Sequence, residues 1–247
     1  PSFLTSRRPP DALDRLNALF RRMGRPEFDT LPPAEGVVAR TGGRKGSFSL
    51  IPKPLWGLAA LLCTASLFFT ISGTFMASWK PQILGMSGLD MTMVGIAGMA
   101  SSGAGVISHL AVGALARVVG ELRIAIIFLA ATIAALIIFG LVPAGATIPL
   151  IAAVAVWGFC NVGSYTALIL VNLTQYDVGV RNAGLGLALG CGRIGGIVGP
   201  LFGGFAIGSG MGRFWALSIF ALMLIPPIVA LLTIAARKPG AGREGAA

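Results

Sequence analysis

The sequence has little charge and few residues of the kinds that bind metals. Asp, Glu, Lys and Arg make up 11% of its 247 residues, against about 25% in ordinary soluble domains. One histidine, His109, and three scattered cysteines provide neither a zinc-ligand spacing nor a disulfide framework. The low charge excludes a typical water-soluble globule, and we expect no metal and no cofactor.

Apolar residues, in contrast, are abundant. They account for 55% of the chain, and the mean hydropathy is +0.84. Many fall in runs long enough for a helix to cross a hydrocarbon core of about 30 Å. We therefore predict an all-α membrane protein in which residues 54–236 form one bundle of six transmembrane helices, at 55–79, 92–116, 124–142, 148–173, 182–208 and 214–236.

The ends of the chain are polar. Residues 1–53 are interpreted as a cytoplasmic basic loop, and residues 237–247 as a cytoplasmic tail. Within the loop, a short amphipathic helix over 11–23 is predicted by apolar residues at helical spacing, namely Leu13, Leu16, Phe20 and Met23. Because the chain opens on Pro1 and not on Met, we expect it to be a piece of a longer protein.

The formal net charge of +10 is unevenly distributed. Ten of the 19 basic residues lie in residues 1–53, and placing that segment in the cytoplasm puts most of the others on the same side: Arg117, Arg123, Arg181, Arg237, Lys238 and Arg243. Only Lys80 and Arg213 fall outside. The positive-inside rule thus predicts a multi-pass protein of the cytoplasmic (inner) membrane with both ends cytoplasmic. The partner of the basic surface is the lipid bilayer and not nucleic acid.

Polar residues are concentrated on particular spans. The first carries Cys63, Ser66, Thr70 and Thr74, and the fourth carries Trp157, Asn161, Ser164, Tyr165, Leu168 and Asn172 on one face. The second and fifth spans are also polar, whereas the third and sixth are nearly apolar and are predicted to face lipid. The order polar, polar, apolar occurs twice, which indicates two inverted three-helix repeats around a cavity. Packing remains an alternative for the Ser and Thr residues, since their hydroxyls can bond back to the preceding turn.

Arg193 is the most informative residue. It lies twelve residues beyond Arg181, roughly 18 Å into the membrane. An arginine there costs at least about 2.5 kcal/mol on insertion scales and cannot lose its proton, so it needs water, a carboxylate or an anionic ligand. Since no Asp or Glu falls within the spans, an anion site is favoured. A structural Arg193, bonded to helix-end carbonyls or to a carboxylate on a missing partner domain, is the alternative.

The glycines of the same span divide into two sets. Gly186, Gly190 and Gly196 share the side of Arg193 and leave room for a ligand. On the opposite side, small residues at four-residue spacing predict close packing against another helix: Gly195, Gly199 and Gly203.

His109 is a candidate proton relay, although an imidazole bonded to a neighbouring helix is an equal alternative. Gly190–Gly195 matches the dinucleotide fingerprint by its letters. It lies inside a membrane helix with no preceding strand, so we treat that match as coincidence.

These features resemble the second half of a major facilitator superfamily transporter. Pro1–Leu4 is similar to the segment after the sixth helix of such proteins, and Ser78–Pro81 to the end of the seventh. Arg181–Gly204 resembles the eleventh helix of the aromatic acid:proton symporters. The resemblance implies that the two arginines of this helix, Arg181 and Arg193, are functionally important. Arg181 is equally well explained as a topology anchor.

Two further motifs bear on this resemblance. The loop motif Gly-x-Leu-Ala-Asp-Arg-x-Gly after the eighth helix is matched by Gly113–Gly120, with Arg117 in the acidic position. It implies a gate at the cytoplasmic entrance that includes Gly113, Arg117 and Arg181. Gly195-x-x-x-Gly-Pro200-x-x-Gly-Gly204 matches the fifth-helix motif of drug:proton antiporters, which leaves such an exporter as the alternative.

We therefore predict the C-terminal half of a secondary transporter that moves a small organic anion, with an aromatic carboxylate favoured, together with protons by alternating access. The predicted substrate-binding residues are Arg193, Asn161, Tyr165, Trp157, Ser164, Thr70 and Thr74. The proton-accepting carboxylates are expected in a missing N-terminal six-helix half. An intramembrane enzyme is disfavoured because no Gly-x-Ser-x-Gly motif and no membrane aspartate pair occur, and a scaffold would not need Arg193.

Overall fold

The computed structural model describes residues 12–22, 30 and 51–237. The chain divides into two units, residues 1–45 and 46–247, which are considered separately. In the first unit, helix α2 (Ala12–Arg22) is the short amphipathic helix expected from the apolar spacing. Leu16 on its apolar face is buried, whereas Asp14 and Arg15 are exposed. Met23, the last apolar residue of the predicted helix, lies outside the described residues.

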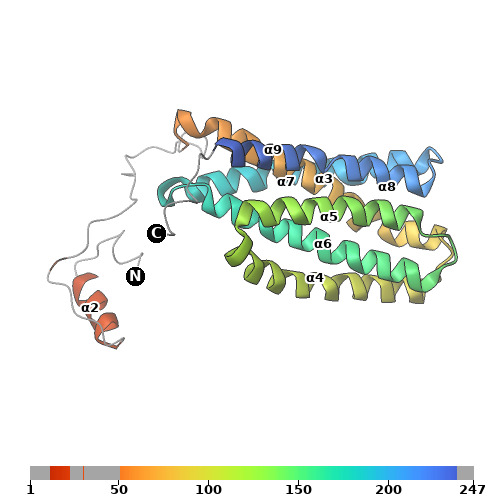
Figure 1. Cartoon of the computed structure of the whole chain (residues 1–247), viewed down its shortest axis with the longest axis horizontal. Helices are drawn as coiled ribbons and strands as arrows, with labels where there is room; N and C mark the ends of the chain where they lie inside the picture. The colour runs from red at the N-terminus through yellow and green to blue at the C-terminus, as the bar shows by residue number, and fades with distance from the viewer. Residues whose placement is uncertain (1–11, 23–29, 31–50, 238–247) are drawn as a thin grey trace, which may run out of the picture. The chain divides into compact units, whose positions relative to one another are not determined.

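The second unit is a bundle of long helices joined by short turns (Figure 1). A single turn, η2 (Lys53–Leu55), leads into α3 (Trp56–Met86), and the chain continues through α4 (Met91–Val119), α5 (Glu121–Leu141), α6 (Thr147–Thr174), α7 (Val178–Gly208), α8 (Arg213–Leu222) and α9 (Ile225–Arg237). Counting α8 and α9 together, six segments of the described chain are long and apolar enough to cross a membrane. The predicted six spans are confirmed.

The last span differs from the single helix expected over 214–236. It is broken between α8 and α9 at Met223 and Leu224. Pro226 and Pro227 follow after Ile225, and because proline has no backbone N–H, two intrahelical hydrogen bonds are lost at this point. The chain tightens here, and the Leu224 N–H donates to the Ala221 carbonyl at 3.0 Å.

The helix packing has an internal symmetry. Helix α3 packs on α7 and α9, and α6 packs in the same way on α4 and α5. Exchanging the first three spans with the last three converts one set of neighbours into the other, and α5 with α8 and α9 closes the bundle (Figure 1). Since each repeat has three helices, the second begins on the opposite membrane face. This packing agrees with the predicted pair of inverted repeats.

The contact between α3 and α7 depends on glycine. A β-carbon at Gly195 would lie 2.5 Å from the carbonyl oxygen of Leu67, closer than real contacts allow. One at Gly199 would collide with Ile71 and Thr74, and one at Gly203 with Phe75 and Trp79. The prediction of close packing on this side of α7 is confirmed. By contrast, a β-carbon at Gly186 or Gly190 would meet open space.

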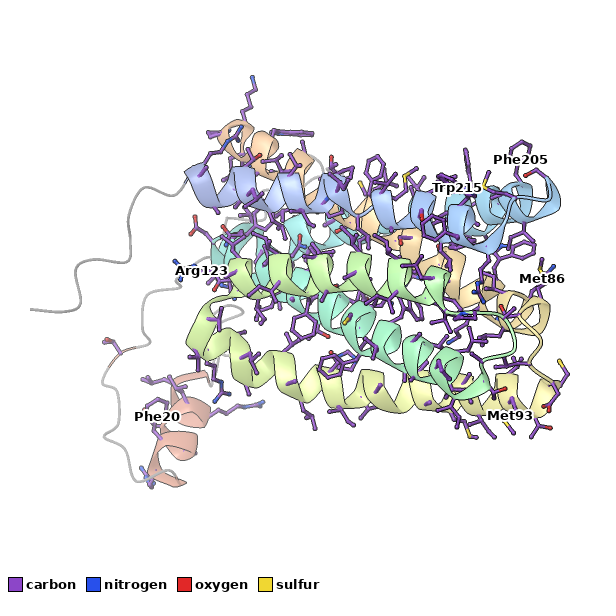
Figure 2. The ribbon with its side chains drawn as sticks, turned by 45° about the vertical axis from the view of Figure 1, so that its right-hand side comes forward. Phe20, Met86, Met93, Arg123, Phe205 and Trp215 are labelled. Carbon is purple, nitrogen blue, oxygen red and sulfur yellow. The ribbon has the colours of Figure 1, made fainter. Side chains whose placement is uncertain are left out.

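Basic residues gather at one end of the bundle. Because successive helices run in opposite directions, the turns between α4 and α5 and between α6 and α7 lie with the start of α3 and the end of α9. Figure 2 shows Arg123 at this basic end and Met86, Phe205 and Trp215 at the opposite end. The charge asymmetry behind the topology prediction is therefore present in the fold, and the orientation itself stays a prediction.

Candidate functional site

A pocket of about 230 Å³ opens between α3, α6 and α7. It contains Arg193 of α7 together with polar residues of α3 and α6. Its lining is Ser66, Phe69, Thr70, Thr74, Tyr165, Leu168, Ile169, Asn172, Leu189, Gly192, Arg193 and Gly196. The polar faces predicted for the first, fourth and fifth spans thus meet in space.

A second pocket, of about 280 Å³, adjoins the first. It shares Phe69, Thr70, Thr74 and Tyr165 and adds Gly73, His109, Asn161 and Val162, so α4 contributes to it as well. We call the two pockets together the central groove. Neither α5 nor α8–α9 provides a lining residue. The lipid exposure predicted for the third and sixth spans stays a prediction.

Arg193 has no protein partner within the described chain. Its side chain is exposed, and it forms no hydrogen bond or ion pair with residues 51–237. Carboxylates within that range occur only at helix ends, at Asp90, Glu121 and Asp177. Because a guanidinium stays charged, the groove is electropositive and an anion is the ligand that its charge favours.

An aromatic pair stands in the same groove. The rings of Phe69 and Tyr165 are stacked, with centroids 6.2 Å apart and planes at 19°. Both residues line both pockets. Tyr165 was predicted from the sequence and Phe69 was not, although Phe69 is next to Thr70 and three residues after Ser66 on the same polar face. The pair offers a flat apolar surface within reach of the cationic pocket.

Thr70 and Thr74, the two groove threonines of α3, donate their hydroxyl protons to carbonyls of the same helix. The Thr70 hydroxyl donates to the Ser66 carbonyl and the Thr74 hydroxyl to the Thr70 carbonyl, both at 2.7 Å. Each hydroxyl therefore turns only lone pairs toward the groove. Both hydroxyl protons are thus used within α3, as expected if these hydroxyls bond back to the preceding turn. Arg193 remains the main hydrogen-bond donor for an anion.

Asn172 lies at one end of the first pocket and is buried. Its Nδ2 donates to the Leu168 carbonyl at 2.9 Å, whereas its Oδ1 has no partner among the described residues. A buried acceptor left without a partner is costly, which favours a donor from a ligand or water in this pocket.

His109 projects from α4 toward α6. Its Nδ1 lies 2.6 Å from the Thr166 hydroxyl, which is also 2.9 Å from the Val162 carbonyl. A hydroxyl has one proton, so if it is donated to Val162, Nδ1 must carry the ring proton. Nε2 is then left as a free acceptor. The contact accommodates both roles considered for His109, helix pairing and proton transfer.

Ser164 and Trp157 do not line the central groove. Ser164 is fully buried, donates to the Cys160 carbonyl at 2.9 Å and lies 3.0 Å from the Thr132 hydroxyl of α5. Its hydroxyl is therefore turned to the neighbouring helix and away from a substrate. Trp157 is buried too, one turn beyond Asn161 toward the opposite end of the bundle.

Lys80, predicted from the sequence to lie on the outer side, contacts residues of two neighbouring helices. Helix α3 continues to Met86, and the Lys80 ammonium lies 5.5 Å from the centre of the Trp157 ring and 3.4 Å from the Ser101 hydroxyl. Both contacts join α3 to buried side chains of α4 and α6. Lys80 is thus a second cation that contacts buried residues of the bundle. Its position before Pro81, near the expected end of the first span, did not predict these contacts.

The residues predicted for the cytoplasmic entrance lie at the basic end, away from the central groove. Gly113 and Arg117 are exposed in the last turns of α4, and Arg181 is half-buried in the first turn of α7 with an unpartnered Nε. The nearby Tyr176 ring packs where Gly184 has no side chain. Burial, with a smaller contribution from Cys63, raises the pKa of Tyr176 to about 12, so its phenol stays neutral.

Comparison with known proteins places these features in a family context. The family model described as Major Facilitator Superfamily matches residues 16–200, which is more than half of the chain. The search of curated proteins found no match to this chain.

Proposed function

The chain belongs to the Major Facilitator Superfamily of secondary transporters, and we propose that it forms the six-helix half of a transporter that moves a small organic anion with protons. An aromatic carboxylate is the favoured substrate. The observation that carries the proposal is an unpartnered Arg193 beside the stacked Phe69–Tyr165 pair, in a groove without a carboxylate.

The binding mode follows from the two kinds of surface. A planar guanidinium matches a carboxylate with two parallel charged hydrogen bonds, and the aromatic pair accepts the substrate ring. The first pocket, of about 230 Å³, adjoins the second, of about 280 Å³. The stacked Phe69–Tyr165 pair offers a surface for one aromatic ring, so single-ring acids are the substrates to test first. Asn161 and the oxygens of Thr70 and Thr74 supply polar contacts to ring substituents.

Proton coupling is assigned to two groups of residues. His109 Nε2 is the candidate acceptor on this chain. The central groove has no carboxylate, so the other proton-accepting groups are expected on a second six-helix bundle, which alternating access also requires. In this proposal the basic end is cytoplasmic, and Gly113, Arg117 and Arg181 stand at the entrance on that side of the inner membrane.

A drug:proton antiporter is the second candidate. It is favoured by the glycine ridge around Pro200, since Gly195 and Gly199 pack directly on α3. Against it stands the charge of Arg193, which repels a cationic drug.

The test uses the full-length protein in liposomes with an imposed pH gradient. We expect labelled single-ring aromatic acids to accumulate on the alkaline side, and a protonophore should abolish the accumulation. Unlabelled acids should compete, whereas the matched neutral amides should not, because an amide lacks the charge that Arg193 binds. Proton-driven movement of a cationic drug without competition by acids would instead support the antiporter. The isolated 247 residues should insert but not accumulate substrate.

A further inference from the structure

A third pocket, of about 270 Å³, lies at the basic end of the bundle. It is formed where α3 begins and where α6 and α9 end, and we call it the end pocket. Its lining is Pro54, Leu58, Leu61, Gln175, Ile234 and Arg237. It shares no residue with the central groove, so the transport site does not account for it.

The charge of the end pocket is positive. The Arg237 guanidinium lies against the first turn of α3, where a β-carbon on Gly57 would be only 3.3 Å from it. Within residues 51–237 no carboxylate pairs with Arg237, and none lines the pocket. The exposed Lys53 precedes Pro54 in the chain and adds a second cation nearby.

The end pocket also has a hydrogen-bond donor without an acceptor. Gln175 caps the C-terminus of α6, and its Nε2 is buried with no partner in the described chain. A buried donor in this state is stabilised by any ligand that brings an acceptor to it. A guanidinium and an amide together suit an oxyanion that has several acceptor oxygens.

The remaining walls are apolar. Leu58, Leu61 and Ile234 belong to the membrane-crossing parts of α3 and α9, so the apolar wall continues from the cationic rim into the bilayer. A small hydrated anion gains nothing from such a wall, whereas an amphiphile fits both surfaces. Basic pockets between helix ends at a membrane surface are suited to acidic headgroups.

We propose that the end pocket binds an anionic phospholipid. Its phosphate contacts Arg237 and Gln175, and the first part of an acyl chain lies along Leu58, Leu61 and Ile234. The site anchors the ends of α3, α6 and α9 in the leaflet at the basic end. The proposal does not rest on the identity of the transported substrate.

The experiment measures lipid retained by the purified full-length protein, by native mass spectrometry after mixing with phosphatidylglycerol. The wild type should retain phosphatidylglycerol in preference to phosphatidylcholine. Removing a charged hydrogen bond with Arg237→Gln should lower the apparent affinity about tenfold, and Gln175→Leu should lower it less. Arg117→Gln is the matched control, because it removes a charge at the same end but outside the pocket. Substrate is absent throughout, so failure of the transport proposal would not affect the result.

Several outcomes would overturn the proposal. Equal loss of lipid in Arg237→Gln and Arg117→Gln would show that only the general surface charge matters. Displacement of phosphatidylglycerol by millimolar inorganic phosphate would identify a free-anion site. Lipid binding that appears only after deletion of residues 239–247 would show that the chain itself fills the pocket. Because each variant is compared per molecule recovered in the monodisperse fraction, a folding defect cannot imitate these results.

Discussion

Two arginines in apolar helices of this protein have opposite surroundings. Arg213, at the start of α8, donates to the Ser87 hydroxyl at 2.6 Å, to the Gly140 carbonyl at 3.4 Å and to the Val142 carbonyl. It also lies 5.9 Å from the centre of the Phe139 ring. Its side chain therefore joins the ends of α3 and α5 to the start of α8.

Arg193 has none of these partners. It faces the central groove without a hydrogen bond or ion pair from the described residues. The structural role considered for Arg193 from the sequence is thus found at Arg213, where carbonyl oxygens at the end of α5 accept hydrogen bonds from the guanidinium. The partners of a membrane arginine, and not its depth alone, therefore distinguish a structural arginine from one that is available to a ligand.

The largest expected effect separates the two arginines by function. Arg193→Gln in the full-length protein should abolish nearly all uptake at normal abundance, and Arg193→Lys should lose most of it, because a lysine lacks the planar two-pronged donor. Loss of a charged hydrogen bond corresponds to about 1.5–3 kcal/mol, or roughly ten- to a hundredfold in affinity. The measurement is the initial uptake rate per transporter molecule for each Arg193 variant and the wild type. Normal uptake per molecule in the Gln variant would contradict the binding role.

Arg213→Gln should show the reverse behaviour. The substitution removes the charged hydrogen bonds that link α3, α5 and α8, and we expect a loss of about 2 kcal/mol in the free energy of unfolding. The thermal midpoint and abundance should fall, while uptake per remaining molecule stays near the wild-type value. A variant of normal stability with impaired uptake would mean that Arg213 also belongs to the transport machinery.

The third prediction tests which side of α7 is packed and which is open. Gly195→Ala places a β-carbon 2.5 Å from the Leu67 carbonyl oxygen and should destabilise the α3–α7 contact by about 1–2 kcal/mol. Gly190→Ala is the matched control on the same helix. It meets open space and should be neutral or stabilising by up to about 1 kcal/mol. Equal effects of the two substitutions on the thermal midpoint would refute this division of α7.

The smallest effect concerns the buried hydroxyl pair. Thr132→Val removes the 3.0 Å contact with Ser164 and should cost about 1 kcal/mol of stability. The concentration dependence of uptake should not change, because neither residue lines the central groove. A raised KM in this variant would instead support the sequence-based prediction that Ser164 belongs to the substrate site.

Sequence reasoning succeeded where the physical cause is local. Hydropathy over about 20 residues identified six spans, and the 3.6-residue period placed Thr70, Asn161, Tyr165 and Arg193 on faces that do meet in the central groove. Ser164 belongs to the same stripe but faces Thr132 of α5, since a helical stripe about 100° wide contains residues that turn to either neighbouring helix. The contact of Lys80 with Trp157 was not predicted, because the two residues are far apart in the sequence and the residues around Lys80 do not indicate it.

The six spans, the paired repeats and the uncompensated charge of Arg193 could be predicted from the amino-acid sequence, since length, periodicity and unpaired charge are properties of single segments. The partners of each polar residue depend on the tertiary structure. Thr132 and Ser164 are 32 residues apart, and Arg213 and Ser87 are 126 apart. Such contacts depend on which helices are neighbours and how each is rotated, and those are set by the packing of whole faces, such as the glycine side of α7 against α3.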